Sequence, residues 1–465
     1  MVFRKLSKFN PASSVSYFLY SRVWQIVSFS VNLVLITTVF RPVEQGFYYA
    51  FLNFIAYMTL AEFGFNFLLT QFMSHEWVNV QVVDGCAHAP ERTKARLASL
   101  LRVASIWTSF MIAASILLIG VGGWIFFRTS PNATTLTWQM PWALLVLAIS
   151  TNLVVYTLRA ILEGMDLMHL SQRAAFIATA LSCIVLWIAM TCGLGLYSLA
   201  LSQACVSVVL LALYVPPLLP VLRLRGTKAA GHDVISWWRD VWPVQWKIGV
   251  SWIANLIINQ SFVPFIFHYQ GAIEGGRVGI LIQAYSFANM AGQAWLQTSM
   301  PKLAQLWARG EVDGLRRSAG RIVLKSTAFT FAIGAAALVA VAMVKTALPF
   351  YGQRIGDLSA LAFLMASCVA FQIINVFSYA VRANKREPFI WQNITFAMLI
   401  AINNFMLSRV SSTMMFAGFL AVILLVIIPW VYSIWRRETR LPSSDAMGAG
   451  LRRGVGELAI RTDPS

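Results

Sequence analysis

The stretch from Glu44 to Trp77 reads EQGFYYAFLNFIAYMTLAEFGFNFLLTQFMSHEW, and its apolar run is long enough to cross a membrane. Roughly 20 apolar residues span the hydrocarbon core as a helix, because lipid offers no partner to an exposed backbone polar group. Glu62 lies well inside this run. A carboxylate there is costly unless it is paired or faces water. The stretch therefore predicts a membrane helix in which Glu62 has a charged partner or faces a water-filled cavity.

The whole chain has the composition of an integral membrane protein. Of its 465 residues, 58% are hydrophobic and only 12% are charged, and its mean hydropathy is +0.68. Soluble domains carry about 25% charged residues. We therefore predict an all-α polytopic membrane protein with about twelve transmembrane helices. The predicted spans are 14–39, 46–70, 100–127, 139–161, 172–192, 195–220, 245–268, 277–300, 322–349, 358–381, 389–408 and 412–434.

A polar, basic stretch divides these spans into two groups of six. Pro216, Pro217 and Pro220 close the sixth span, and the stretch follows them directly. Too little apolar content remains near the C terminus to form a packed core. We predict an N-terminal six-helix lobe (1–222), a basic cytoplasmic linker (223–244), a C-terminal six-helix lobe (245–435) and a mobile cytoplasmic tail (436–465).

The placement of positive charge predicts the orientation in the membrane. Lys and Arg accumulate in cytoplasmic loops, and most of the 36 basic residues fall on one side if the N terminus is inside. Both termini are therefore expected in the cytoplasm. The net charge of +18 is mainly this topology signal, strengthened by attraction to anionic membrane lipids, and it predicts no nucleic-acid partner. The basic connections 92–102 and 309–325 are expected to gather anionic lipid-linked molecules at the inner face.

The opening stretch recurs in the second half of the chain. EGGRVGILIQAYSFANMAGQAWLQTSMPKLAQLW aligns with it without a gap, so that Glu44 falls on Glu274 and Gly46 on Gly276. The preceding helices also correspond, as WQIVSFSVNL and WKIGVSWIANL, and the fourth and tenth spans end in LRAILEG and VRANKRE. Transporters built from two similar bundles bind their substrate between them. The alternative is coincidence among apolar helices of low complexity.

These segments resemble a known family of transporters. The EQGFYY start, the LAEFGFNFLLTQF that follows and the YSFANMAGQAWLQTSMPKLAQL of the eighth span are similar to the polysaccharide-transport branch, the Wzx-like oligosaccharide flippases. This branch belongs to the multidrug/oligosaccharidyl-lipid/polysaccharide (MOP) exporter superfamily, and the resemblance covers all of the predicted spans. Gly279 stands where a family member commonly has Tyr, so the second copy of the repeat is degenerate.

The resemblance implies a MOP/MATE-like fold of two pseudo-symmetric six-helix lobes. It implies transport of an isoprenoid-diphosphate-linked oligosaccharide across a bacterial inner membrane for surface or exopolysaccharide assembly, with glycan-assembly membrane proteins as further partners. It implies no catalytic residue. The lipid II branch of the superfamily usually has two additional helices, which argues against lipid II as the substrate.

Polar side chains recur along one face of two spans in the second half. They are Ser251, Asn255 and Asn259 on the seventh span and Ser286, Asn289, Gln293 and Gln297 on the eighth. Amides in lipid are costly unless they face one another or water. Two interpretations stay open: these groups contact a glycan headgroup in a central passage, or they form hydrogen bonds that hold the helices together.

Arg22 in the first span is predicted to share a depth in the membrane with Glu62. At 1.5 Å per residue, each lies roughly 12 Å from the cytoplasmic end of its helix. We therefore predict that the two side chains interact inside the first lobe, with Thr59 and Asn66 supplying further hydrogen bonds to Glu62. The pair either orients the two helices or supplies an arginine that alternates between Glu62 and the substrate diphosphate. An arginine in the first helix recurs in related flippases.

Two other functions remain as alternatives to the flippase. One is a cation-coupled exporter of small amphipathic compounds, and the other is an integral membrane glycan polymerase or ligase. Because no Asp-x-Asp, HExxH, Walker or Gly-x-Ser-x-Gly pattern occurs, we predict a transporter rather than an enzyme. The five cysteines lack metal-type spacing, so no metal site, cofactor or catalytic residue is predicted.

Overall fold

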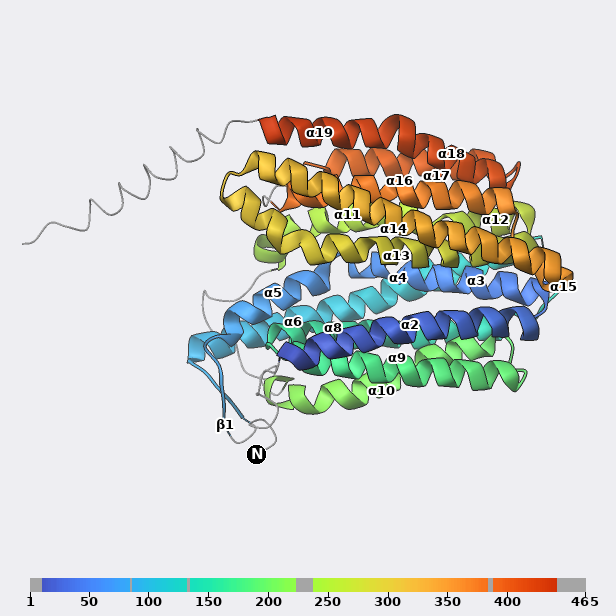
Figure 1. Cartoon of the computed structure of the whole chain (residues 1–465). Coiled ribbons are helices and arrows are strands. Elements are labelled where there is room, and N and C mark those ends of the chain that lie inside the picture. Colours follow the sequence, from blue (N-terminus) through green and yellow to red (C-terminus); the bar gives the residue numbers. More distant parts are fainter. Residues whose placement is uncertain (1–10, 84–85, 132–133, 223–236, 384–387, 441–465) are drawn as a thin grey trace, which may run out of the picture. The chain divides into compact units, whose positions relative to one another are not determined.

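The computed structural model describes residues 11–83, 86–131, 134–222, 237–383 and 388–440 (Figure 1). Most of these residues are helical. A short antiparallel pair of strands, β1 (Gln81–Val83) and β2 (Cys86–His88), follows the second predicted span, with Gln81 opposite His88. Residues 223–236 of the predicted linker and 441–465 of the predicted tail lie outside the described residues.

The helices follow the predicted spans closely. Their bounds are α2 (Pro11–Val39), α3 (Pro42–Ala56), α4 (Met58–Glu62), α5 (Phe65–Trp77), α6 (Glu91–Ala114), η1 (Ser115–Val121), α7 (Gly122–Arg128), α8 (Gln139–Gly164), α9 (Met168–Thr191), α10 (Tyr197–Leu222), η3 (Trp237–Val241), α11 (Trp242–Gln260), α12 (Phe262–Gln270), α13 (Ala272–Ala308), α14 (Val312–Ala347), α15 (Pro349–Gly352), α16 (Leu358–Arg382), α17 (Ile390–Leu407), α18 (Ser412–Val422), η4 (Ile423–Ile427) and α19 (Ile428–Arg440). Each predicted span coincides with one helix or with a consecutive run of them.

Length and hydropathy identify which of these helices can cross a membrane. Within the described ranges, eight helices or continuous helical runs meet both requirements, and two bent pairs qualify as broken spans. The pairs are α3–α4 with α5 and α11 with α12, bent by 48° and 49°. The prediction of an all-α polytopic membrane protein is therefore confirmed. Helices α2 and α13 contain 29 and 37 residues, and the sequence analysis predicts that they cross the membrane as well.

The chain forms two compact units. The first comprises Met1–Ile280, Leu348–Gly356 and Asn404–Arg409, and the second comprises Leu281–Ala347, Asp357–Asn403 and Val410–Ser465. Helices α11 and α12, which the sequence analysis assigns to the C-terminal lobe, belong to the first unit. The lobe boundaries predicted from the sequence stay a prediction.

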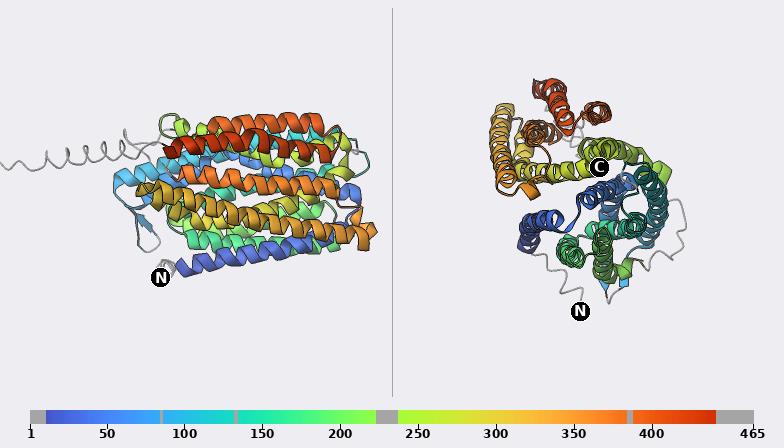
Figure 2. Two further views of the ribbon diagram at one scale, coloured as in Figure 1. Left: turned by 45° about the horizontal axis from the view of Figure 1, so that its top comes forward. Right: turned by 90° about the vertical axis from the view of Figure 1, so that its right-hand side faces the viewer.

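Helix α8 occupies a central position in the first unit. It lies against α5 and α10, while α9 contacts both α10 and α2 (Figures 1 and 2). Aromatic rings fill the space between the end of α7, the start of α8 and α3. The ring of Phe127 lies 5.0 Å from that of Phe51 and 5.1 Å from that of Trp142, and all three side chains are buried. This packing holds the start of α8 against α3 and α7.

The two copies of the repeated stretch touch each other within the first unit. A Cβ added to Gly276 would lie 2.8 Å from the backbone nitrogen of Gly46, its counterpart in the repeat. A Cβ added to Gly279 would overlap the ring of Tyr49, which is again its own counterpart. Equivalent residues meet in this way when an approximate two-fold relation joins two copies. The glycine that makes the second copy degenerate therefore gives room to a buried tyrosine of the first copy.

Candidate functional site

Glu62 lies at a break in the second span. It is the last residue of α4, and Phe63 and Gly64 follow with φ of 47° and 73°. Both values are left-handed, so a right-handed helix cannot continue through them. The ring of Phe63 packs against α11, where a Cβ added to Gly249 would lie 2.5 Å from it. The sequence predicts a continuous helix here, and the break is a structural feature that hydropathy does not reveal.

The buried Glu62 carboxylate lies close to an amide and a guanidinium. Its side chain is 7% exposed, and it lies beside the Asn66 amide and within electrostatic reach of the Arg159 guanidinium. The sequence analysis predicts a hydrogen bond from Asn66 to Glu62; the amide lies beside the carboxylate, and both of its polar atoms are buried without a hydrogen-bond partner among the described residues. The side chains of Arg22 and Thr59 lie outside the described residues, so the predicted pairing of Arg22 with Glu62 stays a prediction.

Arg159 links Glu62 to a second carboxylate, on α8. Its Nε donates a hydrogen bond to Glu163 Oε1 at 2.8 Å, and the two side chains form an ion pair one helical turn apart. The side chains of Arg159 and Glu163 are 37% and 21% exposed respectively, so neither is fully buried. Ser171 Oγ donates to the same Glu163 oxygen at 2.7 Å. Glu163 is thereby held in place on two sides, and it positions Arg159.

Two further contacts extend this polar cluster. Tyr156, one turn before Arg159 on α8, lies within electrostatic reach of both Glu62 and Arg159. Thr70 Oγ1 donates to the Ala160 carbonyl at 3.2 Å and so ties α5 to α8. The resulting group is called the Arg159 cluster here and consists of Glu62, Asn66, Tyr156, Arg159, Glu163 and Ser171. It contains two carboxylates and one guanidinium, so a second cation such as Arg22 would balance its formal charge.

The sequence analysis does not identify Arg159 as a site residue. It treats Arg159 only as one of many positive charges near the cytoplasmic side. A signal is present, because Arg159 and Glu163 are spaced four residues apart and therefore share one face of an apolar helix. Their connection to Glu62 requires the packing of α5 against α8, which the sequence does not specify.

The polar residues of the seventh span mainly contact their own helix, α11. Asn259 Nδ2 donates to the backbone oxygen of Asn255 at 2.8 Å and to its Oδ1 at 3.0 Å. Ser251 Oγ donates to the Lys247 carbonyl at 3.2 Å. Asn255 is exposed, so its amide is accessible to a ligand. Whether these three residues line a passage or only hold the helices together therefore stays open.

The polar residues of the eighth span divide into two kinds. Gln372 Nε2, from α16, donates to Asn289 Oδ1 at 2.9 Å, and Gln293 Nε2 approaches the same oxygen at 3.4 Å. Ser326 Oγ on α14 lies within hydrogen-bond distance of Gln372 Oε1, at 3.2 Å. Asn289 therefore belongs to a network that holds α13, α14 and α16 together.

The other two residues of that span are accessible. Ser286 and Gln297 are exposed, and Ser286 Oγ donates to the carbonyl of Ile282 at 2.9 Å. A role in a passage stays a prediction for both. Among the described residues, no three His, Cys, Asp or Glu side chains are grouped so that they could hold a metal ion.

Comparisons with known proteins identify the fold. Neither a protein-family model nor a curated protein matches the chain. The inward-facing conformation of a multidrug resistance MATE family transporter of the MOP superfamily matches with a TM-score of 0.54 and 12% identity, over 90% of this chain and 96% of that one. The lipid II flippase MurJ in an inward closed conformation matches with a TM-score of 0.56 and 11% identity, over 96% and 94%. The chain therefore has the fold of MOP-superfamily transporters.

Proposed function

We propose that the chain is a transporter of the MOP type, and specifically a flippase for an isoprenoid-diphosphate-linked oligosaccharide in a bacterial inner membrane. The observation that carries this proposal is the arginine of the Arg159 cluster. Its bond to Glu163 uses Nε, and within the described part of the chain its terminal amino groups have no hydrogen-bond partner. A partly exposed guanidinium with free donors, held on a membrane helix, is suited to bind a phosphate.

The carboxylates of the cluster give the site a way to release its ligand. Without substrate, Glu163 neutralises Arg159, and the nearby Glu62 adds to the attraction. A diphosphate that enters competes with these carboxylates for the guanidinium. When the diphosphate leaves, Glu163 resumes the full ion pair, so the arginine is never left as an unpaired charge in a medium of low dielectric.

Alternating access would carry the polar headgroup across the membrane. In this mechanism the diphosphate and the sugars pass through the protein while the isoprenoid tail stays in lipid, which avoids moving charge through hydrocarbon. Net direction requires that the substrate binds the inward-facing and outward-facing states differently. Enzymes that assemble the glycan on its lipid would supply the substrate and are the partners that this function implies.

A cation-coupled exporter of small amphipathic compounds is the second candidate. The buried Glu62 favours it, because a carboxylate inside the membrane can hold a proton or a cation. The likeness to MATE transporters gives the fold of such an exporter but not its substrate.

Ligand-dependent thermal stability of the purified protein distinguishes the two candidates. A ligand at about 100 times its Kd stabilises the native state by about 2.7 kcal/mol, which raises the melting temperature. We expect isoprenoid-diphosphate oligosaccharide to produce this shift, and Arg159→Gln to abolish it. Arg173→Gln, at an exposed arginine on the neighbouring helix α9, serves as the matched control and should keep the shift. Stabilisation by cationic amphiphiles alone would instead support the exporter.

A further inference from the structure

Helices α13 and α14 form a long hairpin, most of which belongs to the second unit. They contain 37 and 36 residues, and at 1.5 Å per residue each is about 55 Å long. The hydrocarbon core is only about 30 Å thick, so the hairpin must extend beyond it. The turn between the helices contains Gly310 with φ of 70°, and it lies on the side predicted to be cytoplasmic. Residues near this turn therefore reach the headgroup region of the inner leaflet.

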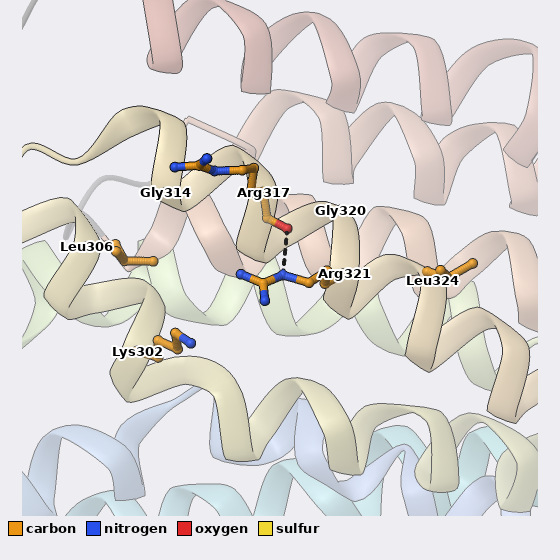
Figure 3. Close-up of a pocket in the computed structure, with 7 residues that line it drawn as sticks. All are labelled: Lys302, Leu306, Gly314, Arg317, Gly320, Arg321 and Leu324. Atoms are coloured by element: carbon orange, nitrogen blue, oxygen red, sulfur yellow. Dashed lines mark hydrogen bonds between the residues drawn. The ribbon is translucent and has the colours of Figure 1, made fainter.

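A pocket of about 630 Å³ lies between the two helices near the turn (Figure 3). Lys302 on α13 and Arg317 and Arg321 on α14 line it, together with Leu306, Gly314, Gly320 and Leu324. The two arginines are four residues apart and so share a face of α14. Arg321 Nε donates to the Arg317 carbonyl at 3.4 Å, and Figure 3 shows the Arg321 side chain extending into the space between the helices.

The cations of this pocket have no described carboxylate within ion-pair distance, although Glu311 Oε2 lies 3.4 Å from a Cβ built on the lining residue Gly314. The acidic residues closest in sequence, Glu311 and Asp313, lie 3.9 Å from Arg309 and Arg316, which do not line the pocket. Among the residues that the structure describes, Lys302, Arg317 and Arg321 form no ion pair. The pocket thus presents three cations with unused hydrogen-bond donors.

The shape and rim of the pocket fit a lipid rather than a soluble anion. A Cβ added to Gly320 would meet nothing within 4 Å, so the wall on the α14 side is open. Leu324 is 69% exposed one turn further along α14, toward the membrane interior. A headgroup phosphate at the cations would therefore lie directly above an apolar surface that can accommodate acyl chains.

We propose that this pocket binds the headgroup phosphate of an anionic phospholipid of the inner leaflet. Lys302, Arg317 and Arg321 contact the phosphate, and Leu306 and Leu324 contact the first carbons of the acyl chains. The site is separate from the Arg159 cluster, which lies in the first unit, and it does not depend on the transported substrate. An isoprenoid diphosphate offers the same phosphate chemistry, and the experiment below distinguishes the two sources.

Lipid retention by the purified protein tests the site. Native mass spectrometry would count phosphatidylglycerol and phosphatidylcholine molecules retained by the full chain from mixed micelles. We expect wild type to retain more phosphatidylglycerol than phosphatidylcholine. In the triple variant Lys302→Gln, Arg317→Gln, Arg321→Gln, the ratio of the two retained lipids should fall on the order of tenfold. The matched control neutralises three exposed arginines of the same unit, with Arg309→Gln, Arg437→Gln and Arg440→Gln, and removes the same charge.

A second variant separates a shaped pocket from diffuse charge. Gly320→Leu keeps all three cations, fills the open wall and improves helix propensity, so it should fold. We expect it also to lower phosphatidylglycerol retention severalfold. Equal losses in the triple variant and its control would overturn the proposal, as would unchanged retention in Gly320→Leu. Retention of an added isoprenyl diphosphate, but not of phosphatidylglycerol, through the same residues would overturn the assignment to phospholipid.

Discussion

Arg159 is the residue that connects the buried carboxylate of Glu62 with the ion pair on α8. It pairs with Glu163 and attracts Glu62, although these carboxylates come from different helices. The sequence alone indicates that Glu62 is special, because a carboxylate inside an apolar run stands out. The sequence does not indicate that Arg159 on α8 lies near Glu62, because this contact depends on the packing of helices separated by nearly 100 residues. The pairing of Glu62 with Arg22, predicted from their equal depth in the membrane, stays a prediction because the Arg22 side chain lies outside the described residues.

Neutralising variants separate a structural role of Arg159 from a role in transport. Removing one member of a buried ion pair costs about 3–5 kcal/mol, and the partial exposure of this pair makes the cost smaller. We expect Arg159→Gln to lower both stability and transport, and Arg159→Gln with Glu163→Gln to restore stability only. Melting temperature and glycan export would be measured for each variant. Recovery of export in the double variant would mean that the pair only orients helices.

At the scale of elements, hydropathy predicts where helices lie better than it predicts whether they are continuous. The predicted spans coincide with described helices, but two of those spans are broken, at Phe63–Gly64 and at Ser261. An apolar run has the same hydropathy whether it is straight or bent. Gly64 at positive φ is the local reason for the first break, and the packing of Phe63 on α11 adds a tertiary reason.

The internal repeat is the sequence feature that the packing explains in most detail. Gly46 and Gly276, and likewise Tyr49 and Gly279, are counterparts that approach each other closely. Two tyrosines cannot occupy the second of these contacts together, because Tyr49 is already buried there, at 3% exposure. Gly279, which stands where the resembling family commonly has Tyr, therefore also makes room for the packing of Tyr49.

Exchange of these two residues tests that relation. Gly279→Tyr should destabilise by overpacking, by about 1–3 kcal/mol or more, and Tyr49→Gly by leaving a cavity, by about 3–5 kcal/mol. If the positions are equivalent across the repeat, the Tyr49→Gly, Gly279→Tyr double variant should recover part of the loss. Melting curves of the four proteins form a double-mutant cycle that gives the coupling energy. Additive losses would contradict the relation between the two copies.

At the scale of the whole molecule, the fold limits the function without selecting the substrate. Composition and hydropathy predict an all-α membrane protein, and the family resemblance of the repeated stretch implies the MOP fold. The likeness to MATE and MurJ structures agrees with both. At 11–12% identity, that likeness does not reveal what is transported. Substrate choice depends on a few side chains, and Arg159 is the one that we propose binds the diphosphate.

The central claim is that the chain moves a lipid-linked diphosphate oligosaccharide between leaflets. The most direct measurement is the rate at which a fluorescent form of that lipid becomes accessible to a membrane-impermeant quencher in liposomes that contain the purified protein. The account predicts accelerated quenching relative to protein-free liposomes, with Arg159→Gln slowed toward the protein-free rate and Arg173→Gln unaffected. A rate equal to that of protein-free liposomes, with wild-type protein that is folded and inserted, would contradict it.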